Sequence, residues 1–267
     1  MGVGYSCVDM ICMVEDFPVE DSSTHITSRV VQGGGAVATA LVAASRLGTK
    51  CAFIGNIGND IMSDETIRMF QSDGVCTDYM VRRDDCYGLE SIVMVNPANG
   101  SRTKFPQRDY NPPISWDDRL SDVVGGCCIL HLDGTHYENA INVARIAKEH
   151  GVLVSLDGCS MQKDNEKNKI LATMADILIM NSKYPLKVSG KATYDEALLE
   201  MSTWGSKKVV GCTLGDNGSK FVVGGRVVDF PSFKAKSVVD TTGCGDVFHG
   251  AFLSAYVSGM ALEKSIR

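Results

Sequence analysis

One segment organises this chain: Val239-Asp240-Thr241-Thr242-Gly243-Cys244-Gly245-Asp246-Val247-Phe248-His249-Gly250. A polar turn with two glycines runs directly into an apolar series that keeps helical spacing as far as Tyr256. The pattern predicts a helix that begins at the turn, with the N–H groups of Gly243, Cys244 and Gly245 free at its N-terminus. Such N–H groups, together with the positive end of the helix dipole, bind anions. The segment therefore predicts an anion site made from backbone.

A carboxylate, Asp246, stands beside this predicted anion site and would repel an anion. One chemical reason to keep it there is to accept the proton of a hydroxyl that attacks phosphorus. The alternative is a capped helix with acidic residues in its first turn. Chemistry alone leaves both interpretations open.

The run Asp240–Asp246 resembles the signature of the ribokinase-like (PfkB) carbohydrate kinases, with Cys244 where Ala is usual. Further similar segments, at Gly33–Gly48, Asn181 and Thr213–Gly218, extend the resemblance over nearly the whole chain. It implies one α/β domain over residues 1–267. The domain would hold a doubly wound, mostly parallel sheet flanked by helices, with a small β-sheet lid.

The resemblance also implies an activity, the ATP-dependent phosphorylation of a sugar hydroxyl. Asp246 would be the general base, and the Gly243–Gly245 amides would form the anion hole. ATP and Mg²⁺ would be the cofactors. The residues around Asp246 look most like those of fructokinase and other ketose kinases, which favours a ketose such as fructose as substrate.

Composition excludes several other classes of protein. The formal net charge of -6 argues against a nucleic-acid or anionic-membrane surface. No apolar run approaches the roughly 20 residues of a membrane helix, and no basic signal-peptide region is visible. The ten cysteines lie mostly in apolar runs without zinc spacing, which favours a reducing, cytoplasmic compartment.

The first third of the chain predicts the acceptor side of the site. Gly2–Cys7 is expected to be a strand, with Asp9 beyond its carboxyl end, where ligands bind in open α/β sheets. Asp9 is therefore a candidate for binding sugar hydroxyls, a turn residue being the alternative. Extended segments within about 11–32 and 88–107 do not fit the strand–helix alternation. We expect them to form the lid and to pair between the subunits of a homodimer, as the resemblance implies.

A glycine run, Gly33, Gly34 and Gly35, opens the predicted helix Ala36–Leu47 and lets a ligand approach the backbone. A dinucleotide-binding interpretation fails because no G-x-G-x-x-G follows a buried strand. The family places an Asn where this chain has Ala38, which leaves the sugar open. Arg108 and Asn111, in a proline-rich loop, are further candidates for contacting the sugar, exposed loop residues being the alternative.

From Gly126 onward, strands alternate with helices, which indicates parallel βαβ units. Asp133 and Asp157 fall at predicted strand ends, and Asp133 is the better candidate for contacting the sugar. Asn181 resembles the Asn of a family motif that organises magnesium and phosphate. Tyr184 stands where that motif has Glu, and a phenol cannot replace a carboxylate that holds hydrated magnesium.

The resemblance places the nucleotide along Thr213, Gly215 and Gly218. It also assigns Asp240 and Thr242 to half of a monovalent-cation site, which K⁺ would occupy. Family members continue with further helices beyond the position of Arg267, where the given sequence ends. We therefore expect those helices to be absent from this chain.

Two alternatives to the sugar kinase remain. A nucleoside kinase of the same family is one, although few aromatic residues near Gly33 could stack on a base. The other is a sugar-binding or regulatory relative with impaired catalysis, which Tyr184 motivates. The presence of Asp246 argues against it, since a binding protein has no need of an acid beside its anion site.

Overall fold

A nine-stranded sheet forms the centre of the computed structural model, which describes residues 1–96, 98, 101–236 and 241–267. Its order is β13-β12-β11-β10-β9-β8-β1-β4-β5, parallel from β11 to β5 with an antiparallel hairpin, β12 and β13, at one edge. The strands are β1 (Gly2–Val3), β4 (Cys51–Ile57), β5 (Val75–Arg82), β8 (Ile129–Leu132), β9 (Leu153–Gly158), β10 (Ile177–Asn181), β11 (Val209–Thr213), β12 (Ser219–Val223) and β13 (Arg226–Phe230).

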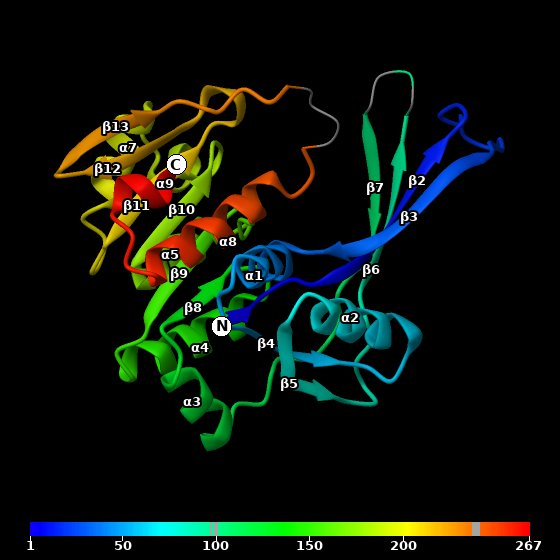
Figure 1. Cartoon of the computed structure of the whole chain (residues 1–267), viewed down its shortest axis with the longest axis horizontal. Coiled ribbons are helices and arrows are strands. Elements are labelled where there is room, and N and C mark those ends of the chain that lie inside the picture. Colours follow the sequence, from blue (N-terminus) through cyan, green and yellow to red (C-terminus); the bar gives the residue numbers. More distant parts are fainter. Residues whose placement is uncertain (97, 99–100, 237–240) are drawn as a thin grey trace.

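A second, four-stranded sheet projects from one side of the first and is called the small sheet below (Figure 1). Its order is β3-β2-β6-β7, from β2 (Cys7–Val14), β3 (Ile26–Gly34), β6 (Glu90–Val95) and β7 (Arg102–Pro106). Residues directly opposite each other in a sheet share a face. Successive residues of a strand point to opposite faces. The side chains in the row through Asp9 therefore lie on one face of the small sheet, and those in the row through Met10 lie on the other.

Helices cover both faces of the large sheet. They are α1 (Ala36–Arg46), α2 (Ile61–Ser72), α3 (Asp118–Gly125), α4 (Tyr137–Glu149), α5 (Asn165–Met174), α6 (Tyr184–Ser189), α7 (Tyr194–Met201), α8 (Cys244–Val257) and α9 (Leu262–Ile266). Helices α1 and α8 lie side by side on one face (Figure 1). Helices α3 to α7 pack on the other face.

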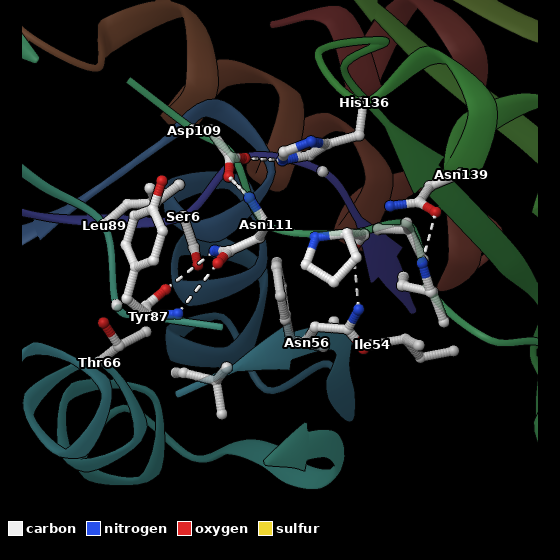
Figure 2. Close-up of a pocket in the computed structure, with 18 residues that line it drawn as sticks. Ser6, Ile54, Asn56, Thr66, Tyr87, Leu89, Asp109, Asn111, His136 and Asn139 are labelled. Carbon is white, nitrogen blue, oxygen red and sulfur yellow. Dashed lines mark hydrogen bonds and ion pairs between the residues drawn. The ribbon is translucent and has the colours of Figure 1, made fainter. Parts of the chain in front are cut away.

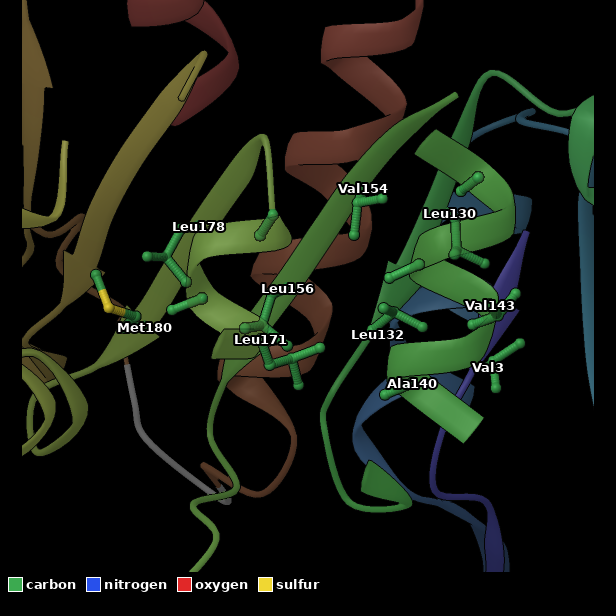
Figure 3. Packing of buried hydrophobic residues seen from close by; sticks show 14 of the residues in the cluster. Val3, Leu130, Leu132, Ala140, Val143, Val154, Leu156, Leu171, Leu178 and Met180 are labelled. Atoms are coloured by element: carbon green, nitrogen blue, oxygen red, sulfur yellow. The ribbon is translucent and has the colours of Figure 1, made fainter. Parts of the chain in front are cut away.

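Alternating side chains of the central strands fill two different cores. Leu130, Val154 and Leu156 pack against α4 and α5, as Figure 3 shows. The intervening positions, including Ile129 and Ile177, pack against Phe252 of α8. Each such buried side chain contributes about 1.5–3 kcal/mol to folding. This packing against the sheet holds α8, and with it the N-terminus of the helix, in one position.

The predicted α/β class and the separate small sheet are confirmed. The expected strand Gly2–Cys7 is wrong, because the chain leaves the large sheet after Val3 and Cys7 already begins β2. Asp9 therefore lies within the small sheet and not beyond a strand of the large one. Strand β5 and helices α3 and α6 were not predicted.

Candidate active site

The N-terminus of α8 has the geometry that its sequence predicts, with one exception. Gly243 caps the helix at φ 74°, a left-handed conformation that favours glycine. Among the described residues, no partner is found for the N–H groups of Gly243 and Gly245. The N–H of Cys244 instead donates to the carbonyl of Thr241 at 3.3 Å. The predicted set of three free amides is therefore reduced to two.

A cavity of about 300 Å³ opens at this helix end, between α8, the start of α1 and the small sheet. Two larger hollows, of about 730 and 660 Å³, contain none of the predicted catalytic or sugar-binding carboxylates. The smaller cavity is lined by Tyr5, Cys7, Asp9, Gln32, Gly33, Gly34, Gly35, Ala36, Thr39, Ser91, Lys104, Pro106, Thr242, Gly243 and Asp246. Predicted residues from both ends of the chain thus meet in one place.

The small sheet supplies a polar wall of this cavity. Asp9 stands opposite Gln32 and Ser91 in the sheet, so their side chains share the face that lines the cavity. The Cys7 thiol donates to Asp9 Oδ1 at 3.4 Å. A Cβ at position 34 would clash with Asp9 Oδ2, so Gly34 is needed for this carboxylate to fit.

Gly35 begins α1 with φ 103°, and a Cβ there would clash with the carbonyl of Tyr5. The glycine run therefore lets β3, α1 and the Tyr5 turn approach closely.

Asp246 is partly buried, and its environment makes it a stronger base than a free carboxylate. Burial raises the pKa of Asp246 to about 6, with the nearby carboxylates of Asp157 and Asp133 adding to the effect and the Lys104 cation opposing it. A group with this pKa is ionised at pH 7 and still binds a proton readily. Asp246 is therefore suited to general base catalysis.

Asp133 is close to the cavity but does not line it. Its side chain is fully buried at the end of β8, where it accepts the N–H groups of Tyr5 at 2.8 Å and Thr135 at 2.9 Å. Burial raises the pKa of Asp133. These contacts join β8 to the turn after β1, where the strand order reverses and ligands bind in such sheets. Asp133 thus positions Tyr5, and the structure does not bring it to the cavity as a sugar contact.

Asn111 and Arg108 also lie elsewhere. The Asn111 side chain accepts the N–H of Tyr87 at 2.9 Å and donates to its carbonyl at 2.9 Å. Figure 2 shows this clamp beside a cavity of only about 50 Å³, near Asp109 and His136. Arg108 is exposed and stacks over Tyr110 at 5.3 Å. The loop is therefore held by its own side chains, and neither residue reaches the cavity of Asp246.

The predicted nucleotide residues lie together at the carboxyl ends of β10 and β11, where Asn181 pairs with Thr213. Asn181 Oδ1 accepts the N–H groups of Lys183 at 2.9 Å and Tyr184 at 3.1 Å, which fixes the start of α6. The 3₁₀ turn Gly215–Asn217 follows β11 and leads into Gly218 at φ 81°.

Tyr184 is 1% exposed, and its hydroxyl donates to the Asn168 carbonyl at 3.2 Å. It belongs to the core and not to the site.

Thr242 lines the cavity, whereas Asp240 lies outside the described residues. Lys104, like Gln32 and Ser91, is a polar cavity residue that the sequence did not single out. It extends from β7, two positions along from the Asp9 row, and therefore shares the face of Asp9. Lys104 belongs to no sequence motif, so only the register of β7 shows that its side chain faces the cavity.

In this α/β fold, a glycine-opened helix end and the facing carboxylates of Asp246 and Asp9 meet in one cavity. The family model for pfkB family carbohydrate kinases matches residues 1–267. The chain belongs to this family and is a carbohydrate kinase.

Relatives with defined activities are similar over almost the whole chain. A deoxyribokinase of Salmonella typhi is 25% identical over 99% of this chain and 88% of its own length. A ketohexokinase of Mus musculus is 24% identical over 99% and 91%. The structure of an Arabidopsis thaliana ribokinase with ribose and ATP superimposes with a TM-score of 0.84, at 25% identity over 99% and 88%. None of the helices in the described part of this chain has the length and apolar character to span a bilayer.

Proposed function

We propose that this chain transfers the γ-phosphoryl group of ATP to a hydroxyl of a small sugar, a ketose such as fructose. The observation that carries the proposal is the cavity in which Asp246 faces Asp9 beside the free N–H groups of Gly243 and Gly245. Among the described lining residues, Tyr5 is the only aromatic one, which suits a sugar better than a nucleobase.

The reaction follows from these positions. Asp9, with Gln32 and Ser91, would bind the sugar hydroxyls, and Asp246 would take the proton of the attacking one. The sugar oxygen then forms a bond to the γ-phosphorus while the bond to the β-phosphate oxygen breaks, which releases ADP. The amides of Gly243 and Gly245 would stabilise the charge on the transferring group.

Magnesium fits this chain as part of the nucleotide and not as a resident ion. Among the described residues, no group of three or more His, Cys, Asp or Glu side chains could hold a metal. Asn181 is engaged by backbone N–H groups, and Tyr184 is buried. We expect Mg²⁺ to enter as MgATP, bound mainly by the phosphates. The K⁺ site through Thr242 stays a prediction.

The acceptor is identified by ADP release with MgATP across a panel of ketoses, aldoses and nucleosides. Turnover that is highest with a ketose supports the proposal. Turnover that is highest with a nucleoside would instead identify the acceptor as a nucleoside. Sugar binding in calorimetry without turnover on any compound would instead indicate a catalytically impaired relative.

A further inference from the structure

Beneath Asp246 lies a buried polar cluster that the reaction described above does not use. The sheet positions that face α8 are apolar at Ile129 and Ile177, but they become polar toward the strand ends, at His131, Ser155 and Asp157. His249 enters this cluster from α8, three residues after Asp246 and on the same side of the helix. Such a polar layer between a sheet and an apolar helix is costly unless its groups are paired.

The contacts within the cluster are specific. His249 Nε2 lies 3.3 Å from Asp157 Oδ1, and these side chains are 4% and 3% exposed. His131 Nδ1 lies 3.1 Å from Ser155 Oγ, and the two imidazole rings are 5.6 Å apart. Burial lowers the pKa of His131 to about 3, so this ring is neutral at physiological pH.

The proton positions follow from the partners. Asp157 can only accept from His249, so Nε2 carries a proton. Nδ1 of His249 has no partner among the described residues. Burial alone would raise the pKa of Asp157, but His249 and His131 hold it below its ordinary value.

We propose that Asp157, held in its ionised form by His249, is an electrostatic positioning residue for the base Asp246. This inference rests on the proposed role of Asp246 in phosphoryl transfer. A fixed negative charge below Asp246 makes its carboxylate bind a proton more tightly. The same pair ties the first two turns of α8 to β9, so the helix end and its base keep one position relative to the sheet.

Charged and titratable groups from several elements also face Asp246. They are Asp133 just after β8, Asp157 of β9, Cys159 just after β9, Lys104 of β7, Asp9 across the cavity on β2, and His249 of its own helix. Asp133 is fixed by two backbone N–H groups, and burial raises its pKa. Of the two buried carboxyls, Asp157 has the larger effect on the pKa of Asp246.

Asp157→Asn tests the inference, since it keeps the shape and can still accept from His249 while it removes the charge. We expect the titration midpoint of the Asp246 carboxyl, followed by ¹³C NMR, to fall by about 0.5–1.5 pH units. The acidic limb of kcat/KM should move by the same amount. Asp176→Asn is the matched control, because Asp176 is a buried carboxylate at the other end of the strands, paired with Lys148. It should move neither value.

His249→Gln and His249→Leu separate the two roles of the pair. His249 itself lowers the pKa of Asp246, and both variants lose that effect. Gln retains an N–H donor that keeps Asp157 ionised, so the midpoint should lie at or above that of the wild type. Leu removes the donor, so Asp157 takes up a proton more readily and the midpoint should lie below that of His249→Gln.

An unchanged Asp246 midpoint in folded Asp157→Asn overturns the inference. Thermal unfolding identifies variants that fail to fold, and the His249 pair of variants then supplies the comparison. The NMR titration needs no turnover. A shifted midpoint in a protein that phosphorylates no acceptor would refute the proposed function and leave this inference standing.

Discussion

Among single residues, the proposed reaction depends most on Asp246 and its environment. A carboxylate at an exposed helix end would be a weak base with an ordinary pKa, whereas this one is partly buried near two other acids. The raised pKa, about 6, has consequences for both the reaction and the stability of the fold.

The first consequence is the pH dependence of turnover. Asp246 must be ionised to take a proton, so kcat/KM should be constant above pH 7 and fall about tenfold per unit below about pH 6. Initial rates of ADP release between pH 5 and 8.5 measure this limb. A rate that stays constant to pH 5 would contradict the assigned base.

The second consequence is a gain of stability when the charge is removed. The pKa is higher in the folded than in the unfolded chain, so the ionised form destabilises the fold above pH 6 and the cost disappears as the pH falls toward 4. Asp246→Asn should therefore increase the free energy of unfolding by about 1–2 kcal/mol at pH 7.5. The gain should vanish near pH 4. Urea denaturation at the two pH values measures it, and a loss of stability at pH 7.5 would count against the assignment.

Residue identity predicted some roles and not others. Asp246 and Gly243 lie at the cavity as expected, because they belong to a helix end that the sequence itself defines. Asp133 and Asn111 are polar residues at the right places along the chain, but their lone pairs are occupied by the N–H groups of Tyr5 and Tyr87. Tyr184 was treated as a changed site residue, although its ring fills the core. Only three-dimensional contacts separate a ligand contact from a structural hydrogen bond.

At the level of single elements, the start of α8 is the proposed anion site. Gly245 leaves open space, because a Cβ there would meet no protein atom within 4 Å. Gly243 differs, since its φ of 74° disfavours any side chain. The two glycines can therefore be tested for different properties.

Gly245→Val should leave the fold intact and weaken MgATP binding at least tenfold, since the added side chain occupies the space beside the free amides. Gly243→Val is the comparison and should also lower stability, by about 1–2 kcal/mol. Calorimetry of nucleotide binding and thermal unfolding separate the two effects. Normal nucleotide affinity in Gly245→Val would exclude these amides as the phosphate site.

Elements with strong local patterns were predictable, and those that depend on distant contacts were not. Helix α5 was expected at Asn165–Met174, where it lies, because apolar spacing and a capping Asp define it. Strand β5 was missed because its sequence, Val75–Arg82, has charged residues and is only half-buried at the sheet edge. The departure of the chain from β1 into β2 was also missed, since β1 is only two residues long and has no pattern of its own.

At the scale of the whole molecule, the small sheet has two different faces. The row through Asp9 lines the cavity, and the next row joins Val31, Met10, Ile92 and Phe105 on the opposite face. Val31, Ile92 and Phe105 are 40%, 40% and 56% exposed. An apolar row across a small sheet favours contact with another protein surface, which supports the expected homodimer.

Sedimentation velocity at micromolar concentration should accordingly give the mass of a dimer, about 57 kDa from 28.7 kDa per chain. Phe105→Glu should shift it to a monomer while circular dichroism stays unchanged. Lys220→Glu, on the distant edge hairpin, is the control. A wild-type monomer at all concentrations would remove the small sheet as an interface. The cytoplasmic location stays a prediction from cysteine usage.

The proposed reaction depends above all on Asp246 acting as the base of phosphoryl transfer. Its most direct test compares Asp246→Asn with the wild type, using the best acceptor of the panel, for kcat and for acceptor affinity. We predict that kcat falls by about 10²–10⁴-fold, while the dissociation constant of the acceptor changes less than about threefold. Unchanged turnover in the folded variant would contradict the account.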